Sequence, residues 1–223
     1  MARVASFHVV RHASALTALR RLATDRLRRP PGLVFGRLLG TGRGADTGPS
    51  ADLRRTALFA VWHTADDLDR YLDAVTGRPG VVERYDVRLR GIGGHGSWRG
   101  VDVLDDLEPG EGDGPIAVLT RAGVRMGAWR SFRRAGPPVS TELAAAGGLL
   151  AAMGVGALPV GRLGTFSLWS DVVAMRAFAS SPRHRDVVRR TRQERWYGEE
   201  LFARFEPYGS SGTWAGRDPL AAT

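Results

Sequence analysis

The sequence of 223 residues contains no cysteine and no lysine. Without cysteine, the protein has no disulfides, no thiolate-ligated haem or iron–sulfur cluster, no cysteine-based zinc site and no cysteine nucleophile. Without lysine, it has neither Schiff-base chemistry nor the lysine of a phosphate-binding P-loop. A transition metal bound by this chain must therefore use His, Asp, Glu, Tyr or Met side chains as ligands.

The sequence also lacks any run of about 18 uncharged apolar residues that could span a membrane. Its first residues have no apolar centre of the kind that a signal peptide needs, so we expect a cytoplasmic protein. Hydrophobic residues make up 43% of the chain. This is enough for the core of one large domain or of two domains of about 100 residues each.

The net charge of +9 rests on arginine alone. A basic surface suits nucleic acid, an anionic membrane or an acidic electron donor. The sequence has no helix-turn-helix, zinc-finger or aromatic RNA-binding motif, so we do not expect it to bind nucleic acid. A peripheral membrane contact and a homodimer stay open.

The first half of the chain, residues 1–107, has the pattern of one folding unit. Its apolar residues predict strands over 3–11, 33–39, 55–62 and 81–92. Ser14 and Thr64 are placed to cap two intervening helices, and the glycine-rich stretch 41–50 is expected to form a turn. The first helix is expected to bury its leucines, which are Leu16, Leu19, Leu22 and Leu27. The order β-α-β-β-α-β is that of a ferredoxin-like fold.

The second half, residues 115–223, follows an acidic, glycine-rich linker at 108–114. We expect a strand over 115–124, a helix from 126 that Pro137 and Pro138 interrupt and an Ala-rich helix over 142–153. A hairpin over 154–158 and 162–169 and a helix from Asp171 follow. The last stretch, 182–205, has apolar residues at helical spacing among arginines. It predicts a cationic amphipathic helix capped by Ser180 or Ser181.

The two halves repeat one motif. Gly96-Ser97-Trp98-Arg99-Gly100 matches Gly212-Thr213-Trp214-Ala215-Gly216, and the strand-ending Trp62 matches Trp169. Self-similarity of this kind indicates a duplicated structural unit. We therefore predict the α+β class, with tandem ferredoxin-like repeats that form a dimeric α/β barrel within one chain and enclose a cavity between sheet and helices.

His184 lies near the start of the arginine-rich final helix. A neutral imidazole on a packed helix can hold a metal or haem iron, and arginines around it can pair with anionic groups such as haem propionates. The alternative is an ordinary, partly exposed residue among solvated arginines. The other histidines form no i, i+4 zinc pair, and the sequence has no Gly-x-Ser-x-Gly hydrolase elbow.

Five segments carry a resemblance to a known family: residues 115–122, 164–169, the stretch around His184, 196–205 and 212–216. They resemble the spheroidene monooxygenases of carotenoid biosynthesis. The resemblance covers nearly the whole chain and is weak at 41–54 and 104–114. It implies an enzyme that uses haem b and molecular oxygen, with electrons from a ferredoxin-type donor, to oxidise an apolar small molecule.

The resemblance also implies site residues. Haem enzymes built on dimeric α/β barrels, such as chlorite dismutases and aldoxime dehydratases, bind iron through a histidine of the second half, so His184 is the expected axial ligand. The other expected site residues have three roles. Arg185 and Arg189 would pair with the propionates, and Trp129 and Trp196 would form pocket walls. Arg121 and Arg125 would donate hydrogen bonds to bound oxygen on the distal side.

Two other functions fit the same residues. A non-catalytic or cofactor-free barrel would bind an apolar ligand without iron. A cofactor-free oxygenase or isomerase would turn over its substrate after removal of metal and haem. An absorption spectrum of the purified protein distinguishes both from a haem enzyme.

Overall fold

The computed structural model describes residues 2–25, 29–44, 51–157 and 162–221. The elements of the first half are β1 (Val4–His12), α1 (Ala15–Asp25), β2 (Leu33–Gly42), β3 (Ala51–Trp62), α2 (Ala65–Val75) and β4 (Val81–Gly96). Those of the second half are β5 (Ile116–Val124), a 3₁₀ turn (Met126–Ala128), α3 (Trp129–Ala144), β6 (Leu149–Ala157), β7 (Arg162–Trp169), α4 (Val172–Ala179), α5 (Pro182–Gln193) and β8 (Tyr197–Gly212).

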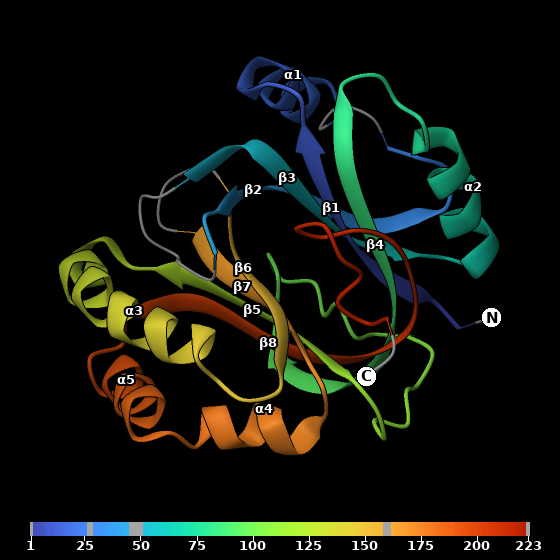
Figure 1. Ribbon diagram of the computed structural model, residues 1–223. Coiled ribbons are helices and arrows are strands. Elements are labelled where there is room, and N and C mark those ends of the chain that lie inside the picture. The colour runs from blue at the N-terminus through green and yellow to red at the C-terminus, as the bar shows by residue number, and fades with distance from the viewer. Residues whose placement is uncertain (1, 26–28, 45–50, 158–161, 222–223) are drawn as a thin grey trace.

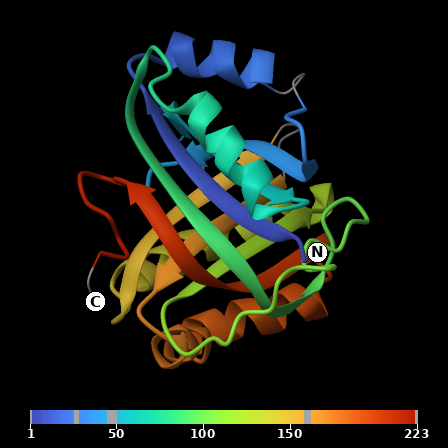
Figure 2. The same cartoon turned by 90° about the vertical axis from the view of Figure 1, so that its right-hand side faces the viewer.

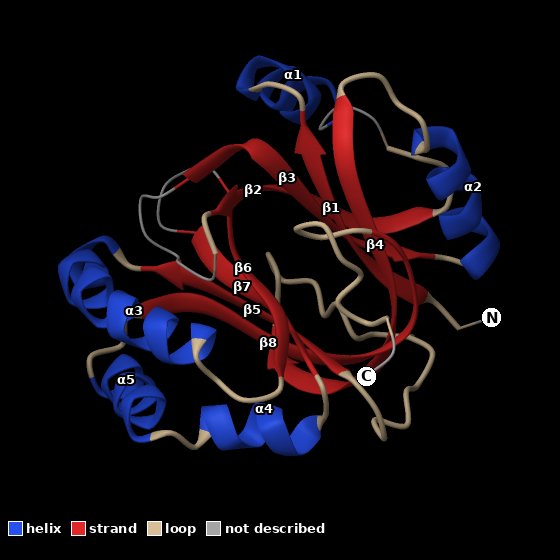
Figure 3. Cartoon of the chain, viewed as in Figure 1, coloured by secondary structure: helices blue, strands red, loops and turns tan. Residues whose placement is uncertain are grey.

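The eight strands close into one barrel, in the order β1-β3-β2-β6-β7-β5-β8-β4. Figures 1 and 3 show the strands as an inner ring with the helices outside it. The helices α1 and α2 cover the sheet of the first half, and α3, α4 and α5 cover the sheet of the second half, on another side of the barrel (Figure 2). The predicted α+β barrel of two ferredoxin-like repeats is confirmed.

The helix starts follow from local capping chemistry. Ser14 Oγ accepts a hydrogen bond from Thr17 N at 3.1 Å, and Thr64 Oγ1 accepts one from Asp67 N at 3.1 Å. The side chain of Ser181 caps α5. Such acceptors satisfy amide groups that have no partner in the first turn of a helix, so these predicted starts are confirmed.

The two seams between the half-sheets differ in length. Strands β4 and β8 pair over eleven residue pairs, from Tyr85–Gly212 to Gly96–Leu201. Strands β2 and β6 pair over only two, Gly40–Gly156 and Thr41–Val155. The β4–β8 seam therefore pairs along most of its length. Along the other seam, the part of β2 from Leu33 to Leu39 is not paired with β6.

Alternate residues of the strands fill the barrel interior. Phe7 of β1 stacks on Phe166 of β7 with ring centroids 3.7 Å apart, and both side chains are fully buried. Each such burial contributes about 1.5–3 kcal/mol of hydrophobic stabilisation. The two sheets thus share one core, which ties the two repeats into a single folded unit.

The repeated sequence motif forms the same turn twice. Arg99 and Ala215, which follow the two tryptophans, both have a left-handed backbone, with φ of 55° and 56°. Trp98 and Trp214 both insert into the barrel core, where their rings stack on the equivalent residues Phe59 and Phe166. The duplication predicted from sequence is therefore also a structural repeat.

Two helices predicted in the second half are wrong in extent. The predicted interruption at Pro137 and Pro138 is wrong, because α3 runs through both prolines to Ala144. The predicted helix over 142–153 is not formed, because β6 begins at Leu149. The predicted final helix ends at Gln193, and the residues from Tyr197 onward form β8. Its buried residues recur at the period of two that strands require, at Leu201, Ala203 and Phe205. Tertiary pairing with β7 in one case and β5 in the other overrides the local helical preference.

The predicted inner face of α1 is also wrong. Leu16 and Leu19 are 57% and 53% exposed, and only Ala18 is buried. The helix lies against β1 and β3 through this small residue, so Leu16 and Leu19 face outward, whereas Leu22 is half-buried. Leu27, and residues 45–50 of the predicted turn, lie outside the described residues.

Candidate active site

A large cavity, of about 1150 Å³, lies between α2 and the strands β2 and β3. Its lining follows both faces of β2 and reaches Gly156 and Gly164 of the second half beside the short seam. The walls between sheet and helix are mainly apolar and include Leu33, Leu38, Leu58, Trp62 and Tyr71. The volume exceeds the roughly 300–1,000 Å³ of ordinary small-molecule sites.

An aromatic wall stands where this cavity enters the barrel. The rings of Phe35 and Trp98 meet edge to face with centroids 5.7 Å apart. Behind them, Phe59 stacks on Trp98 at 5.9 Å. All three side chains are buried. Because packing fixes the wall from behind, its shape is set before any ligand enters.

Guanidinium groups lie over this wall. The Arg37 guanidinium carbon is 4.2 Å from the centroid of Phe35, and that of Arg121 is 5.4 Å from the centroid of Trp98. Both distances are within the range of cation–π attraction. Together with Arg99, which also lines the cavity, they form a set that we call the Trp98 mouth: Phe35, Arg37, Trp98, Arg99 and Arg121.

One carboxylate borders the Trp98 mouth. Glu199 Oε2 lies 2.7 Å from Arg121 Nη1, and Glu199 Oε1 accepts a hydrogen bond from the backbone N–H of Arg99. Burial alone would raise the pKa of Glu199, but the nearby Arg121 guanidinium and the Arg99 backbone N–H hold its pKa below the usual range. Burial and the nearby charges of Arg99 and Arg121 lower the pKa of Arg37. Positive charge therefore dominates the mouth.

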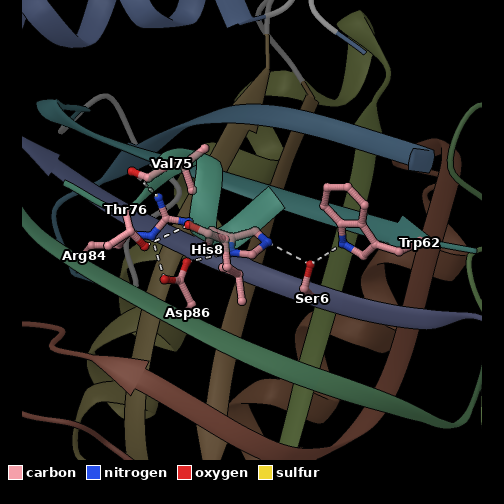
Figure 4. A network of polar contacts seen from close by, with 8 residues as sticks. Ser6, His8, Trp62, Val75, Thr76, Arg84 and Asp86 are labelled. Carbon is pink, nitrogen blue, oxygen red and sulfur yellow. Dashed lines mark hydrogen bonds and ion pairs between the residues drawn. The ribbon is translucent and has the colours of Figure 1, made fainter. Parts of the chain in front are cut away.

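A second polar cluster lies outside the barrel, beneath α2 (Figure 4). His8 Nδ1 is 2.6 Å from Asp86 Oδ1, and His8 Nε2 is 2.8 Å from Ser6 Oγ, which accepts a hydrogen bond from Trp62 Nε1 at 2.8 Å. Asp86 also accepts from Arg84 Nε at 2.6 Å. The order Ser–His–Asp resembles a hydrolase triad. However, Ser6 is fully buried, and the adjoining space is only about 160 Å³. The cluster therefore holds β1, β3 and β4 together.

This cluster predicts a loss of stability in acid. Burial lowers the pKa of His8. Burial alone would raise the pKa of Asp86, but His8 and Arg84 lower it. Lowered pKa values in the folded state give stability that is complete above the unfolded pKa and is lost as the pH falls. We expect the unfolding midpoint to fall by a few degrees between about pH 7 and pH 5.

Thermal unfolding monitored by circular dichroism across this pH range measures the effect. His8→Leu should reduce the pH dependence, and the exposed His95→Gln should leave it unchanged. Part of the dependence should persist in His8→Leu, because burial also lowers the pKa of His12. An equal slope in wild type and His8→Leu would contradict the assignment.

The structure places His184 in the first turn of α5, half-buried. Its Nδ1 is 3.1 Å from the carbonyl oxygen of Ala179, and its ring lies 5.0 Å from that of Phe178. An N–H donated to a backbone carbonyl is the usual orientation of a metal-binding imidazole. His184 nevertheless lines neither of the two cavities described above. Its role as an iron ligand stays a prediction, and the position of the large cavity does not support it.

The other expected site residues are not gathered around His184. Arg185 and Arg125 are exposed, and Arg189 is exposed and paired with Asp186. Trp196 is buried and donates from Nε1 to Glu194 Oε2 at 2.7 Å. Phe132 contacts both Trp196 and the remaining expected wall, Trp129. Of the expected set, only Arg121 lines the large cavity.

The separation has a simple geometric cause. Arg121 follows Ala117 and Leu119 on the inner face of β5, whereas α5 packs on the outer side of the same half-sheet. A strand directs alternate side chains to opposite faces, so the sheet itself stands between Arg121 and His184. Sequence reasoning missed Arg37 and Arg99. The sequence did contain a signal for Arg99, because Arg99 replaces Ala215 as the one charged difference between the two copies of the motif.

Comparison with known proteins adds to this geometry. A search of protein-family models finds no match. The spheroidene monooxygenase of Rhodobacter capsulatus is 31% identical over 209 residues, which cover 87% of this chain and 86% of that protein. The chain belongs to the spheroidene monooxygenase family. The family member of Rubrivivax gelatinosus is 33% identical over 195 residues, and the chain covers 73% of its length. That of Cereibacter sphaeroides is 30% identical over 196 residues, and the chain covers 60% of its length.

Membership of the spheroidene monooxygenase family makes this chain an oxidoreductase of the monooxygenase class. Two solved structures of aldoxime dehydratase, one in complex with butyraldoxime, match 92% of this family member with TM-scores of 0.56 and 0.57. Their sequence identities are 12% and 10%, so this likeness concerns the fold alone.

Two further observations concern the described part of this family member. No group of three or more His, Cys, Asp or Glu side chains there is arranged to hold a metal ion. None of its helices is long and apolar enough to cross a membrane.

Proposed function

We propose that the protein is a monooxygenase that binds a largely apolar small molecule in the large cavity and oxidises it there. The reaction consumes O2, two electrons and two protons, places one oxygen atom in the substrate and releases the other as water. The observation that carries the proposal is the apolar chamber of about 1150 Å³ in a chain of this family. A ferredoxin-type protein is the proposed electron donor.

The chain's own residues have separate tasks in this proposal. The apolar walls between α2 and β2 hold the substrate and exclude water. The exclusion of water prevents side reactions during the oxidation. Phe35 and Trp98 fix the end of the substrate that enters the barrel. Arg121 supplies hydrogen-bond donors at this end, held in place by Glu199. A carotenoid, the substrate class of the relatives' name, is the first compound class to assay.

Haem b is the cofactor that the family resemblance implies, and the structure allows a test of fit. The His184 imidazole has a suitable orientation, with Nδ1 turned to the Ala179 carbonyl. The large cavity is lined mainly by the first half, with Arg121, Gly156 and Gly164 among the second-half residues, and has no histidine among its described lining residues. The residues therefore do not fit a haem held by His184 in the large cavity, and no step of the reaction is assigned to haem.

Two measurements on purified protein test the function. With 18O2, a reductant and a carotenoid, we expect a product that carries one 18O atom and is not formed without O2. Absorption spectra with added haem, for wild type and His184→Ala, test the ligand separately. A Soret band that shifts or disappears in His184→Ala would support His184. A product without 18O would contradict the proposed function.

A second candidate is a cofactor-free oxygenase, or a barrel that binds an apolar ligand without catalysis. The observation that favours it is the large cavity's lining, which in the described residues includes Tyr71 and several arginines but no histidine. Protein stripped of haem and metal distinguishes these functions. Turnover after stripping supports a cofactor-free oxygenase, and tight ligand binding without turnover supports the binding protein.

A further inference from the structure

We propose that the Trp98 mouth binds the carboxylate of a ligand whose larger, apolar part fills the cavity. The inference deepens the proposed function because it names the chemical class of the cavity's ligand. It rests on that function only in taking this cavity as the ligand site.

The charges around the cavity are strongly unequal. Its lining includes seven arginines and two aspartates. Both aspartates have arginine partners: Asp25 lies 3.5 Å from Arg78, and Asp67 lies 2.8 Å from Arg70. The lining arginines outside these pairs are Arg29, Arg37, Arg99, Arg121 and Arg162. An apolar chamber bordered by this excess of cations suits a ligand with an anionic end.

The arginines of the mouth have hydrogen-bonding capacity to spare. Arg37 Nη1 donates to the carbonyl of Gly36 at 2.7 Å, but its buried Nε has no hydrogen-bond partner among the described residues. Arg121 Nη1 is close to Glu199, yet lies outside hydrogen-bond geometry. The positive charges of Arg99 and Arg121 act on Arg37, and both this repulsion and a buried donor without an acceptor cost free energy. A carboxylate that accepts from two guanidinium groups removes both costs.

The internal repeat provides a comparison within the same molecule. Arg37 pairs with Phe59, and its equivalent Met153 pairs with Phe166. Arg99 is equivalent to Ala215 by its place after the motif tryptophan. The equivalent of Arg121 is Val9, because each lies five residues after the strand residue that pairs with Trp62 or Trp169. The second mouth thus closes with apolar residues at all three positions, so the barrel fold does not require the arginines.

Two kinds of ligand share this chemistry, namely a long-chain carboxylic acid and a porphyrin with propionate groups. The experiment compares dodecanoate with its uncharged methyl ester by titration calorimetry on the full chain. A parallel titration follows haem by absorbance. The variants take the residues of the equivalent mouth, Arg37→Met, Arg121→Val and the double substitution. Arg20→Met on the exposed surface of α1 is the matched control.

Wild type and Arg20→Met should bind dodecanoate about 10–100-fold more tightly than the ester, because charge-assisted hydrogen bonds discriminate by this order. The double variant should reduce the preference to about threefold or less and leave ester affinity unchanged. If Arg121→Val does not fold, Arg37→Met alone should still reduce the preference several-fold. If the double variant loses affinity for haem and not for dodecanoate, the same arginines bind a carboxylate, and its source is a haem propionate.

The inference is overturned if the preference for dodecanoate over its ester is absent, or equal in wild type and the double variant, and haem affinity is also equal in the two proteins. Its failure is distinct from that of the proposed function. Carboxylate selectivity without 18O incorporation would leave this binding site intact and contradict the monooxygenase proposal. Incorporation of 18O without carboxylate selectivity would support the monooxygenase proposal and contradict the carboxylate site.

Discussion

Trp98→Ala is expected to destabilise the protein by about 3–5 kcal/mol and to lower kcat/KM by about 100-fold. The side chain is 4% exposed and packs against Phe35 and Phe59, so its removal leaves a cavity in the core. It also removes the ring beneath the Arg121 guanidinium. The substrate's inner end then loses its fixed wall. Urea unfolding and steady-state kinetics measure the two effects.

The internal repeat offers a matched control for this prediction. Trp214→Ala should lose a similar amount of stability, since Trp214 is 6% exposed and stacks on Phe166. Its effect on kcat/KM should stay below about threefold, because Trp214 does not line the large cavity. Trp98→Phe should recover most of the activity. Equal activity losses in Trp98→Ala and Trp214→Ala would contradict the assignment of the chamber to the Trp98 mouth.

Arg121→Glu is expected to destabilise the protein by about 2–4 kcal/mol at neutral pH. Arg121 is 6% exposed, and the substitution replaces an ion pair with two neighbouring carboxylates. Water screens part of this repulsion, because the Glu199 side chain is 30% exposed.

The sign of the pH dependence distinguishes repulsion from a packing defect. In the wild type, the lowered pKa of Glu199 gives stability that is lost as the pH falls. In Arg121→Glu, repulsion raises both carboxyl pKa values, so the penalty of the substitution should shrink as the pH falls through them. Urea unfolding at several pH values measures this. The charge-swapped double variant Arg121→Glu/Glu199→Arg should restore part of the stability. A penalty that does not change with pH would contradict the electrostatic explanation.

The sequence was informative about the fold wherever two independent signals agreed. The Trp98 and Trp214 motifs established the duplication, and Ser14, Thr64 and Ser181 marked helix starts through capping chemistry that is local. It was misleading at β6 and β8, where alanines and arginines favour helix but pairing across the barrel decides. It also misassigned the faces of α1, whose orientation depends on the strands beneath it.

The site was harder to predict, because it depends on which face of a sheet each side chain occupies. Arg121 was expected in the site and lines the cavity, whereas the helix with His184 packs behind the sheet that carries Arg121. Arg37 gave no local signal, since an arginine in a strand is commonly solvated. Arg37 reaches the cavity only because the barrel closes and brings β2, β5 and the Trp98 turn together.

A crystal structure of the protein with bound dodecanoate tests the central claim most directly, because it locates the ligand. We expect the ligand to lie along β2, with its apolar chain between α2 and the sheet and its carboxylate within hydrogen-bond distance of Arg37 and Arg121. A ligand found behind the second half-sheet beside His184, or at the mouth closed by Trp214, would contradict it.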